Sequence, residues 1–148
     1  MSVPAITRAA IVAAARGWIG TPYRHQASLK GIGTDCLGLV RGVWREVLGP
    51  EPQNLPPYQP GWAEEGGGEA MTEAARRHLT EIPLTDHRPG DVLLFRWRAH
   101  LPAKHAGLVS GESSMIHAQE GAVVAEIALQ EWWRRHIASA FRFPGVID

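Results

Sequence analysis

The stretch TDCLGLVRGVWREVL, residues 34–48, decides how the rest of the sequence can fold. Five of its side chains have the spacing of one face of an α-helix, namely Cys36, Val40, Val43, Trp44 and Val47. Thr34 or Asp35 can cap the first turn, and the Gly-Pro pair after Leu48 can end the helix. The sequence therefore predicts a helix from about Cys36 to Leu48, with the cysteine in its first turn.

Cys36 is the only cysteine of the chain, so it cannot form an intramolecular disulfide. The start of a helix carries partial positive charge and unpaired backbone N–H groups, which favour a thiolate over a thiol. The same N–H groups can hold a developing oxyanion. An apolar helical face is also typical of a structural cysteine, because free cysteines are among the most buried residues. Helix position alone leaves both interpretations open.

Outward from this helix, periodicity and turn residues predict helices first and strands afterwards. The other expected helices are residues 7–19, 69–79 and a short one at 130–136. The expected strands are residues 92–97, 105–109, 114–118, 122–127 and 139–143. Residues 49–68 are rich in proline and glycine and predict an irregular surface excursion. Short connections favour antiparallel pairing, so we predict an α+β fold.

Length and charge limit the classes of function. A chain of 148 residues predicts one domain. Lys plus Arg and Asp plus Glu each total 15, so no basic field favours nucleic acid or an anionic membrane. No segment approaches the roughly 20 apolar residues of a membrane span. The apolar run at residues 9–15 is short and is followed by Arg16, so we expect no signal peptide and synthesis in the cytoplasm.

Two histidines are candidate partners for the cysteine. His105 opens one predicted strand and His117 lies in the next, so a hairpin centred near Gly111 places both on one face. A nucleophilic thiol needs a base that a third polar group orients. His117 can also be a core histidine, and Cys36, His105 and His117 can form a zinc ligand set. Without a Cys-x-x-Cys or His-x-x-x-His pair in the sequence, we expect no metal and no cofactor.

Five segments, in this order, resemble the motifs of NlpC-type cysteine peptidases, a papain-like family that cuts the peptides of bacterial peptidoglycan. They are GTPY at residues 20–23, TDCLGLV at 34–40, RPGDVLLF at 88–95, KHAGLV at 104–109 and MIHA at 115–118. Each motif alone is weak, but their common order over most of the chain is specific. The resemblance implies a thiol protease, a hydrolase of the cell wall.

The resemblance also implies a fold and a set of roles. The expected fold is a papain-like α+β core with N-terminal helices, whose nucleophile-bearing helix packs on an antiparallel sheet, and residues 1–148 form a single such domain. Cys36 is then the nucleophile, His105 the base and His117 the residue that orients the base. Tyr23 is expected near the oxyanion, and Asp35 matches a position that binds the free amino end of the substrate.

The tryptophans can line a groove, although core packing is their commoner role. Those considered are Trp18, Trp44, Trp62 and Trp97. Of these we predict Trp62 as a substrate-binding residue.

One departure from the family pattern concerns specificity. Leu37 stands where the family commonly has serine after the cysteine, which leaves the chemistry intact but puts the cleaved peptide in doubt. The bond usual in the family joins D-glutamate to diaminopimelate. The chain length, Leu37 and the proline-rich residues 55–58 resemble the branch found among phage tail genes and gene transfer agents.

These features give the expected setting of the protein. Its partners are predicted to be peptidoglycan stem peptides and other tail or particle proteins, and its place of action the periplasm or cell wall. The alternative is a non-catalytic tail-tip protein that retains the fold and works by assembly. Transfer of the acyl group instead of hydrolysis also remains open.

Overall fold

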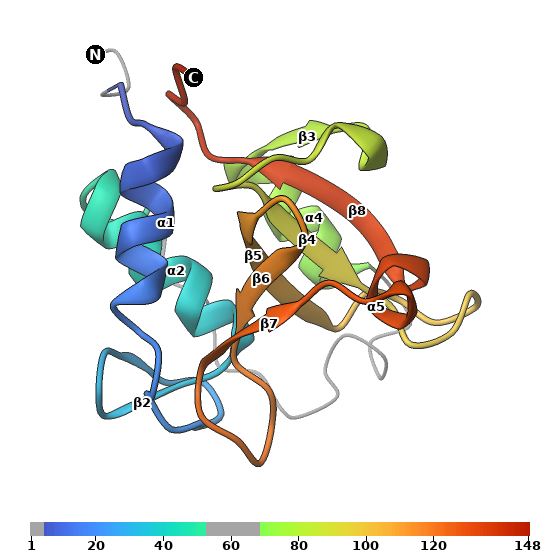
Figure 1. The fold of residues 1–148 in the computed structure, drawn as a ribbon, viewed down its shortest axis with the longest axis horizontal. Helices are drawn as coiled ribbons and strands as arrows, with labels where there is room; N and C mark the ends of the chain where they lie inside the picture. The colour runs from blue at the N-terminus through green and yellow to red at the C-terminus, as the bar shows by residue number, and fades with distance from the viewer. Residues whose placement is uncertain (1–4, 53–68) are drawn as a thin grey trace.

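The computed structural model describes residues 5–52 and 69–148 of the chain. An antiparallel sheet forms one layer, and helices α1 (Arg8–Arg16) and α2 (Cys36–Val47) lie side by side against one of its faces (Figure 1). Most of the predicted excursion at residues 49–68, including Trp62, lies outside the described residues.

Six strands form the main sheet in the spatial order β3-β8-β4-β5-β6-β7, and every neighbouring pair is antiparallel. Their bounds are β3 Thr80–Ile82, β4 Val92–Phe95, β5 His105–Gly111, β6 Ser114–His117, β7 Ala125–Ala128 and β8 Ile137–Arg142. The last strand returns to lie between β3 and β4, so the C-terminal part of the chain is built into the middle of the sheet. The predicted α+β architecture is confirmed.

The remaining helices are α4 (Ala70–His78), α5 (Glu131–Arg135) and a 3₁₀ turn, η1, at Leu84–Asp86. Thr7 caps α1, because its hydroxyl accepts a hydrogen bond from the N–H of Ala10 at 3.0 Å. This helix ends at Arg16 and not at Ile19, since the N–H groups of Trp18 and Ile19 bond to carbonyls three residues back, in turns, instead of four. Among residues 5–52 and 69–148, no helix is long and apolar enough to cross a membrane.

The two faces of the sheet bury separate apolar clusters. On the side of α1 and α2, strand residues such as Leu94, Leu108 and Ile116 pack against the helices. On the opposite side, strand residues that include Phe95 and Val109 pack near α5. All of β4 is therefore buried, which explains why residues 92–95 form a continuous apolar run without alternation.

Several short elements were absent from the sequence prediction. Strands β1 (Ser28–Leu29) and β2 (Gly33–Thr34) form a small hairpin between α1 and α2, and β3 pairs with β8 at an edge of the main sheet. Segments of two or three residues are too short to show periodicity. Strand β7 begins at Ala125 instead of Ala122, because Val123 forms an isolated bridge with Pro22.

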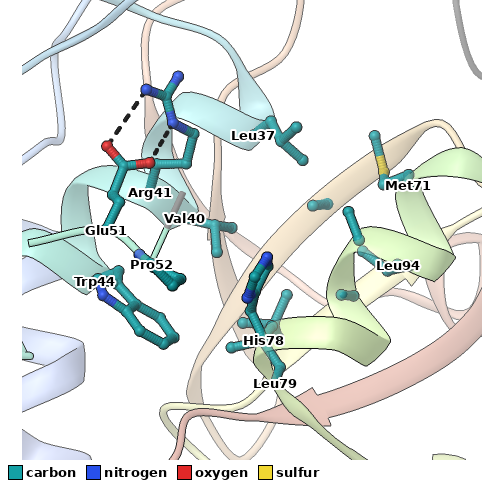
Figure 2. A pocket seen from close by; sticks show the side chains of 14 residues that line it. Leu37, Val40, Arg41, Trp44, Glu51, Pro52, Met71, His78, Leu79 and Leu94 are labelled. Carbon is teal, nitrogen blue, oxygen red and sulfur yellow. Dashed lines mark hydrogen bonds and ion pairs between the residues drawn. The ribbon is translucent and has the colours of Figure 1, made fainter. Parts of the chain in front are cut away.

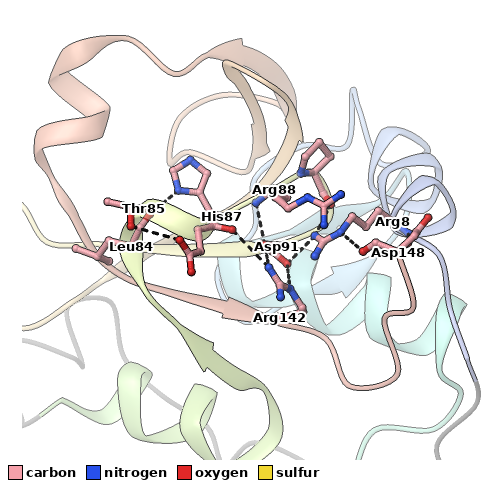
Figure 3. Close-up of polar contacts among 10 residues, drawn as sticks. Arg8, Leu84, Thr85, His87, Arg88, Asp91, Arg142 and Asp148 are labelled. Carbon is pink, nitrogen blue, oxygen red and sulfur yellow. Dashed lines mark hydrogen bonds and ion pairs between the residues drawn. The ribbon is translucent and has the colours of Figure 1, made fainter.

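A buried carboxylate ties distant parts of the chain together. Asp91, at the start of β4, is fully buried and accepts hydrogen bonds from Arg8 of α1 at 3.0 Å and from Arg142 of β8 at 3.0 Å (Figure 3). Arg8 also donates to the backbone carbonyl of Asp148 at 2.6 Å. Arg8 and Asp148 therefore meet at one charged cluster, in which Arg8 and Arg142 neutralise the carboxylate of Asp91.

Replacing Asp91 by asparagine keeps the shape of the side chain but leaves Arg8 facing a neutral group in a buried site. Removing one partner of a buried ion pair typically costs about 3–5 kcal/mol, so we expect Asp91→Asn to lower the free energy of unfolding by about that amount. Urea unfolding at neutral pH measures it. Glu126→Gln, which removes an exposed pair with Arg16, is the control and should change little. Equal midpoints for the two variants would contradict this prediction.

Candidate active site

The first turn of α2 fixes the position of Cys36. The carboxylate of Asp35 caps the helix by accepting from the N–H of Gly38 at 2.7 Å, and its second oxygen accepts from the N–H of Gln26 at 2.7 Å. A Cβ at Gly38 would lie 2.0 Å from the carbonyl oxygen of Ala27, so only glycine allows this contact. The cap and the glycine therefore lock the helix start onto residues 26–28.

The Cys36 sulfur lies against the start of β5. Backbone N–H groups of Ala106, Leu37 and Cys36 itself interact with the sulfur and lower its pKa. Burial and the negative charge of Asp35 act more strongly in the opposite direction, and together they raise the pKa of the thiol to about 12. The N–H groups at the helix start thus act in the predicted direction, towards the thiolate, but burial and Asp35 outweigh them and keep the pKa of the thiol above neutral pH.

His105 and His117 form a buried hydrogen-bonded pair. The Nε2 atom of His105 lies 2.8 Å from the Nδ1 atom of His117, and the two ring planes meet at 83°. Leu108 pairs with Ile116, a register that sets His117 opposite Gly107 and not opposite His105 as the predicted hairpin centre implied. The histidines still share a face, because residues 105 and 107 have the same parity. They meet diagonally across the strand pair.

Both imidazoles are held neutral. Burial, the charge of His117 and the charge of Lys104 lower the pKa of His105 to about 3. Burial lowers the pKa of His117 to about 4. Cys36 and the two histidines therefore form an uncharged set at neutral pH, with one ring nitrogen of His105 engaged by His117 and the other, Nδ1, remaining.

Tyr23 lies close enough to Cys36 for the two to interact electrostatically. Burial raises the pKa of its hydroxyl to about 12, with smaller contributions from electrostatic interaction with Cys36, Asp35 and Glu120. Its backbone N–H donates to the carbonyl of Ala122 at 3.0 Å, which anchors the segment beside α2. Tyr23 is therefore a protonated donor next to the thiol.

The structure thus brings together most of the residues that the sequence singled out. The Cys36 sulfur contacts the backbone amide of Ala106, the residue that follows His105 in β5. Asp35 is buried and engaged by two backbone amides, so the structure gives it a capping role, and its contact with a substrate stays a prediction. In the described part of the chain, no three His, Cys, Asp or Glu side chains are grouped to hold a metal ion.

Sequence reasoning missed the aromatic side chains around the histidine pair. Phe95, Trp97 and Trp133 have ring centroids 5.9, 5.6 and 5.7 Å from that of His105. The doublet at residues 132–133 is a visible signal, but only tertiary packing shows which of the two indoles meets the histidines. Trp97, considered as a groove residue, stacks on His105, whereas Trp18 is buried in the core.

An apolar pocket adjoins the cysteine on the face of the sheet that α2 covers, opposite the aromatic rings around the histidine pair. It lies between α2, α4 and β4, with Leu37, Met71 and Leu94 among its walls (Figure 2). Leu37 follows Cys36 and Ala106 follows His105, so both link the pocket to the thiol. The Nε2 atom of His78 is buried there without a hydrogen-bond partner among the described residues. The residue that departs from the family pattern therefore belongs to an apolar wall.

Comparison with known proteins agrees with this arrangement. The model of the NlpC/P60 family matches residues 20–142. The gamma-DL-glutamyl hydrolase of Bacillus subtilis is 28% identical over 97% of this chain and 31% of that protein. The murein DD-endopeptidase/murein LD-carboxypeptidase MepS of Escherichia coli is 28% identical over 84% of this chain and 57% of that protein. The chain therefore spans less than two thirds of either relative.

Solved structures are similar over nearly the whole chain. The NlpC/p60 domain of the peptidoglycan hydrolase SagA is 27% identical, with a TM-score of 0.66 over 93% of this chain and 100% of that one. An NlpC/P60 family protein from Bacillus cereus, 18% identical, has a TM-score of 0.68 over 95% of this chain and 41% of that one. The second likeness concerns the fold alone.

The neutral histidines make stability depend on pH in a defined direction. Their pKa values lie below the ordinary value of 6.5 that they regain on unfolding, so the unfolded chain binds protons that the folded protein excludes. The contribution of the two histidines to the free energy of unfolding should be fully present above about pH 6.5. It should be lost as the pH drops towards their pKa values in the folded protein. The slope should approach about 1.4 kcal/mol per pH unit for each histidine.

Urea unfolding between pH 7.5 and 5 measures this slope, and the variant His105→Gln/His117→Gln is the comparison. Its stability should vary less with pH over the same range, whatever its absolute value. The same slope in the variant and the original protein would show that other groups cause the acid sensitivity.

Proposed function

Because this chain belongs to the NlpC/P60 family, we propose that it is a cysteine peptidase that hydrolyses peptide bonds of bacterial peptidoglycan. The observation that carries the proposal is the placement of the Cys36 sulfur on the Ala106 amide, one residue from the hydrogen-bonded pair of His105 and His117. The names of the relatives, a glutamyl hydrolase and a murein peptidase, support the same class of substrate.

The proposed reaction starts from neutral groups. As the Cys36 sulfur attacks the scissile carbonyl carbon, its proton passes to Nδ1 of His105, so the charges arise only during the reaction. This requires the tautomer in which Nε2–H of His105 donates to Nδ1 of His117. The imidazolium of His105 then protonates the leaving amine, and the C–N bond breaks to leave a thioester. Water, deprotonated by His105, hydrolyses the thioester and frees the thiol.

The oxyanion needs donors that are already in place. The backbone N–H of Cys36 lies at the start of α2, where the helix has no internal acceptor for it. The hydroxyl of Tyr23 is a second donor, because its raised pKa keeps it protonated. Preformed donors of this kind account for a large share of catalysis in acyl transfer.

The finer substrate assignment rests on the resemblance to the family. We propose the bond between D-glutamate and diaminopimelate, with Asp35 near the amino end of the substrate. Leu37 in an apolar wall supports a contact with an aliphatic part of the peptide beside the thiol. Trp62, outside the described residues, stays the predicted further contact.

The biological setting is likewise a proposal. A single domain of residues 1–148 would act in the periplasm or at the cell wall as part of a phage tail or gene transfer agent, with tail or particle proteins as partners. The chain length, Leu37 and the proline-rich residues 55–58 support this branch. The alternative, a tail-tip protein that binds without cleaving, would have no need of the paired histidines.

Loss of the thiol should abolish cleavage. Purified protein and Cys36→Ala are incubated with muropeptides, and products are identified by mass spectrometry, which also maps the cleaved bond. We expect product from the original protein and none from Cys36→Ala or His105→Gln. His87→Gln is the matched histidine control, because its ring makes an exposed hydrogen bond with the carbonyl of Leu84 (Figure 3). Equal product with and without Cys36, or none from any protein, would refute the peptidase proposal.

Removing the Tyr23 hydroxyl tests its role as a donor. Loss of one oxyanion donor typically lowers kcat about 10²–10³-fold, so Tyr23→Phe should do the same with a much smaller change in KM. Steady-state cleavage of a muropeptide measures both constants, and urea unfolding checks that stability is kept. An unchanged kcat would show that the hydroxyl does not contact the oxyanion.

A further inference from the structure

The two tryptophans of α5 differ in what they touch. Trp133 meets the edge of His117 at a centroid distance of 5.2 Å and lies 5.7 Å from His105. Trp132 is 47% exposed and contacts Trp97 and His136, the latter stacked at 4.0 Å. Both indoles also pack against Trp97 and against each other, but only Trp133 is described in contact with both imidazoles.

Aromatic rings enclose His105 from several elements. Trp97, which follows β4, stacks on its imidazole at 5.6 Å with an angle of 28° between the planes. Phe95 pairs with His105 across β4 and β5, and the centroids of their rings lie 5.9 Å apart. The ring of Phe95 also packs edge to face with Trp133 at 5.1 Å. Trp133 thus closes a cage whose other walls come from β4 and the segment that follows it.

We propose that Trp133 is a positioning residue, which holds His105 and His117 in their hydrogen-bonded geometry and keeps water away from both imidazoles. The proposal rests on the proposed function, in which this pair supplies the base. A ring that touches both histidines restricts their rotation together, whereas contact with one alone would not fix their mutual angle. The geometry of the base thus depends on a helix that contributes no polar group to the reaction.

The charged groups near the pair are few. Lys104, just before β5, and the pair's own mutual charge disfavour the imidazolium, and Cys36 of α2 is a neutral thiol. On α5, Glu131, Arg134 and Arg135 are exposed at the surface. Arg134 donates to the carbonyl of Leu129 and to Ser113. No carboxylate is described as acting on either imidazole, so apolar cover is the chief local influence that substitution of Trp133 would change.

The test compares Trp133→Leu with Trp132→Leu, a matched substitution at the next position of the same helix. NMR titration of the histidine ring signals is recorded on the full chain between pH 3 and 8. We expect Trp133→Leu to raise the titration midpoints of His105 and His117 by at least about one pH unit, because water then reaches the rings. Trp132→Leu should leave both midpoints in place. Unchanged midpoints in Trp133→Leu would overturn the proposal.

Cleavage of muropeptides provides the second readout. Trp133→Leu should lower kcat by at least about tenfold with little change in KM, because misplaced catalytic groups cost rate and not binding. The acid limb of its pH profile should move with the NMR midpoints, and Trp133→Phe should change both in the same direction by a smaller amount. A kcat that falls with no shift of the acid limb would indicate a merely structural role and contradict the proposal.

The two readouts separate this proposal from the proposed function. The NMR midpoints need no turnover, so an inactive original protein would refute the peptidase while the titration still decides whether Trp133 controls the pair. If Trp133→Leu does not fold, as judged by its NMR spectrum, Trp133→Phe decides alone. A smaller ring should raise the midpoints part of the way, and no shift in that variant would overturn the proposal.

Discussion

The close contact of α2 with the loop before it is the constraint on which the site depends. Gly38 faces the Ala27 carbonyl, and a Cβ at Gly42 would lie 2.0 Å from the ring of Trp18 in the segment after α1. Each glycine weakens an isolated helix by about 1 kcal/mol relative to alanine. In return, the helix axis approaches the Ala27 backbone and the Trp18 ring more closely than any other residue would allow. Together with the Asp35 cap, this leaves the sulfur little freedom to move along or around the helix.

The same packing decides the charge state of the site. The dipole of α2 favours a thiolate, but burial and the neighbouring carboxylate of Asp35 oppose it more strongly. The histidines, buried on the α5 side of the sheet, are also neutral. An enzyme built on these residues would therefore separate charge only while substrate is bound, when further backbone donors and the substrate itself surround the reacting atoms.

The sequence predicted the parts of this protein that arise from local pattern. Five spaced side chains located α2, and the motifs around Cys36, His105 and His117 selected the family, which the match over residues 20–142 confirms. The pairing register of β5 and β6 could not be predicted from the sequence, because the irregularity between Val109 and Gly111 shifts His117 relative to His105. The aromatic cage around His105 and His117 could not be predicted either, since Trp133 lies far in the sequence from Phe95 and Trp97. The pKa of Cys36 depends on burial, which no local pattern reports.

The cluster around Asp91 has a mechanical consequence. Ile6 and Val146 form a parallel bridge, with the N–H of Ile6 bound to Gly145 at 2.9 Å and that of Ile147 bound to Ile6 at 3.1 Å. Because these end segments run in the same direction, a force that draws the termini apart shears the bridge and the Arg8 contacts at once. The load would pass from the ends into β4 and β8 through Asp91 and Arg142. Tension applied at the termini would thus reach the sheet before it reached the first turn of α2.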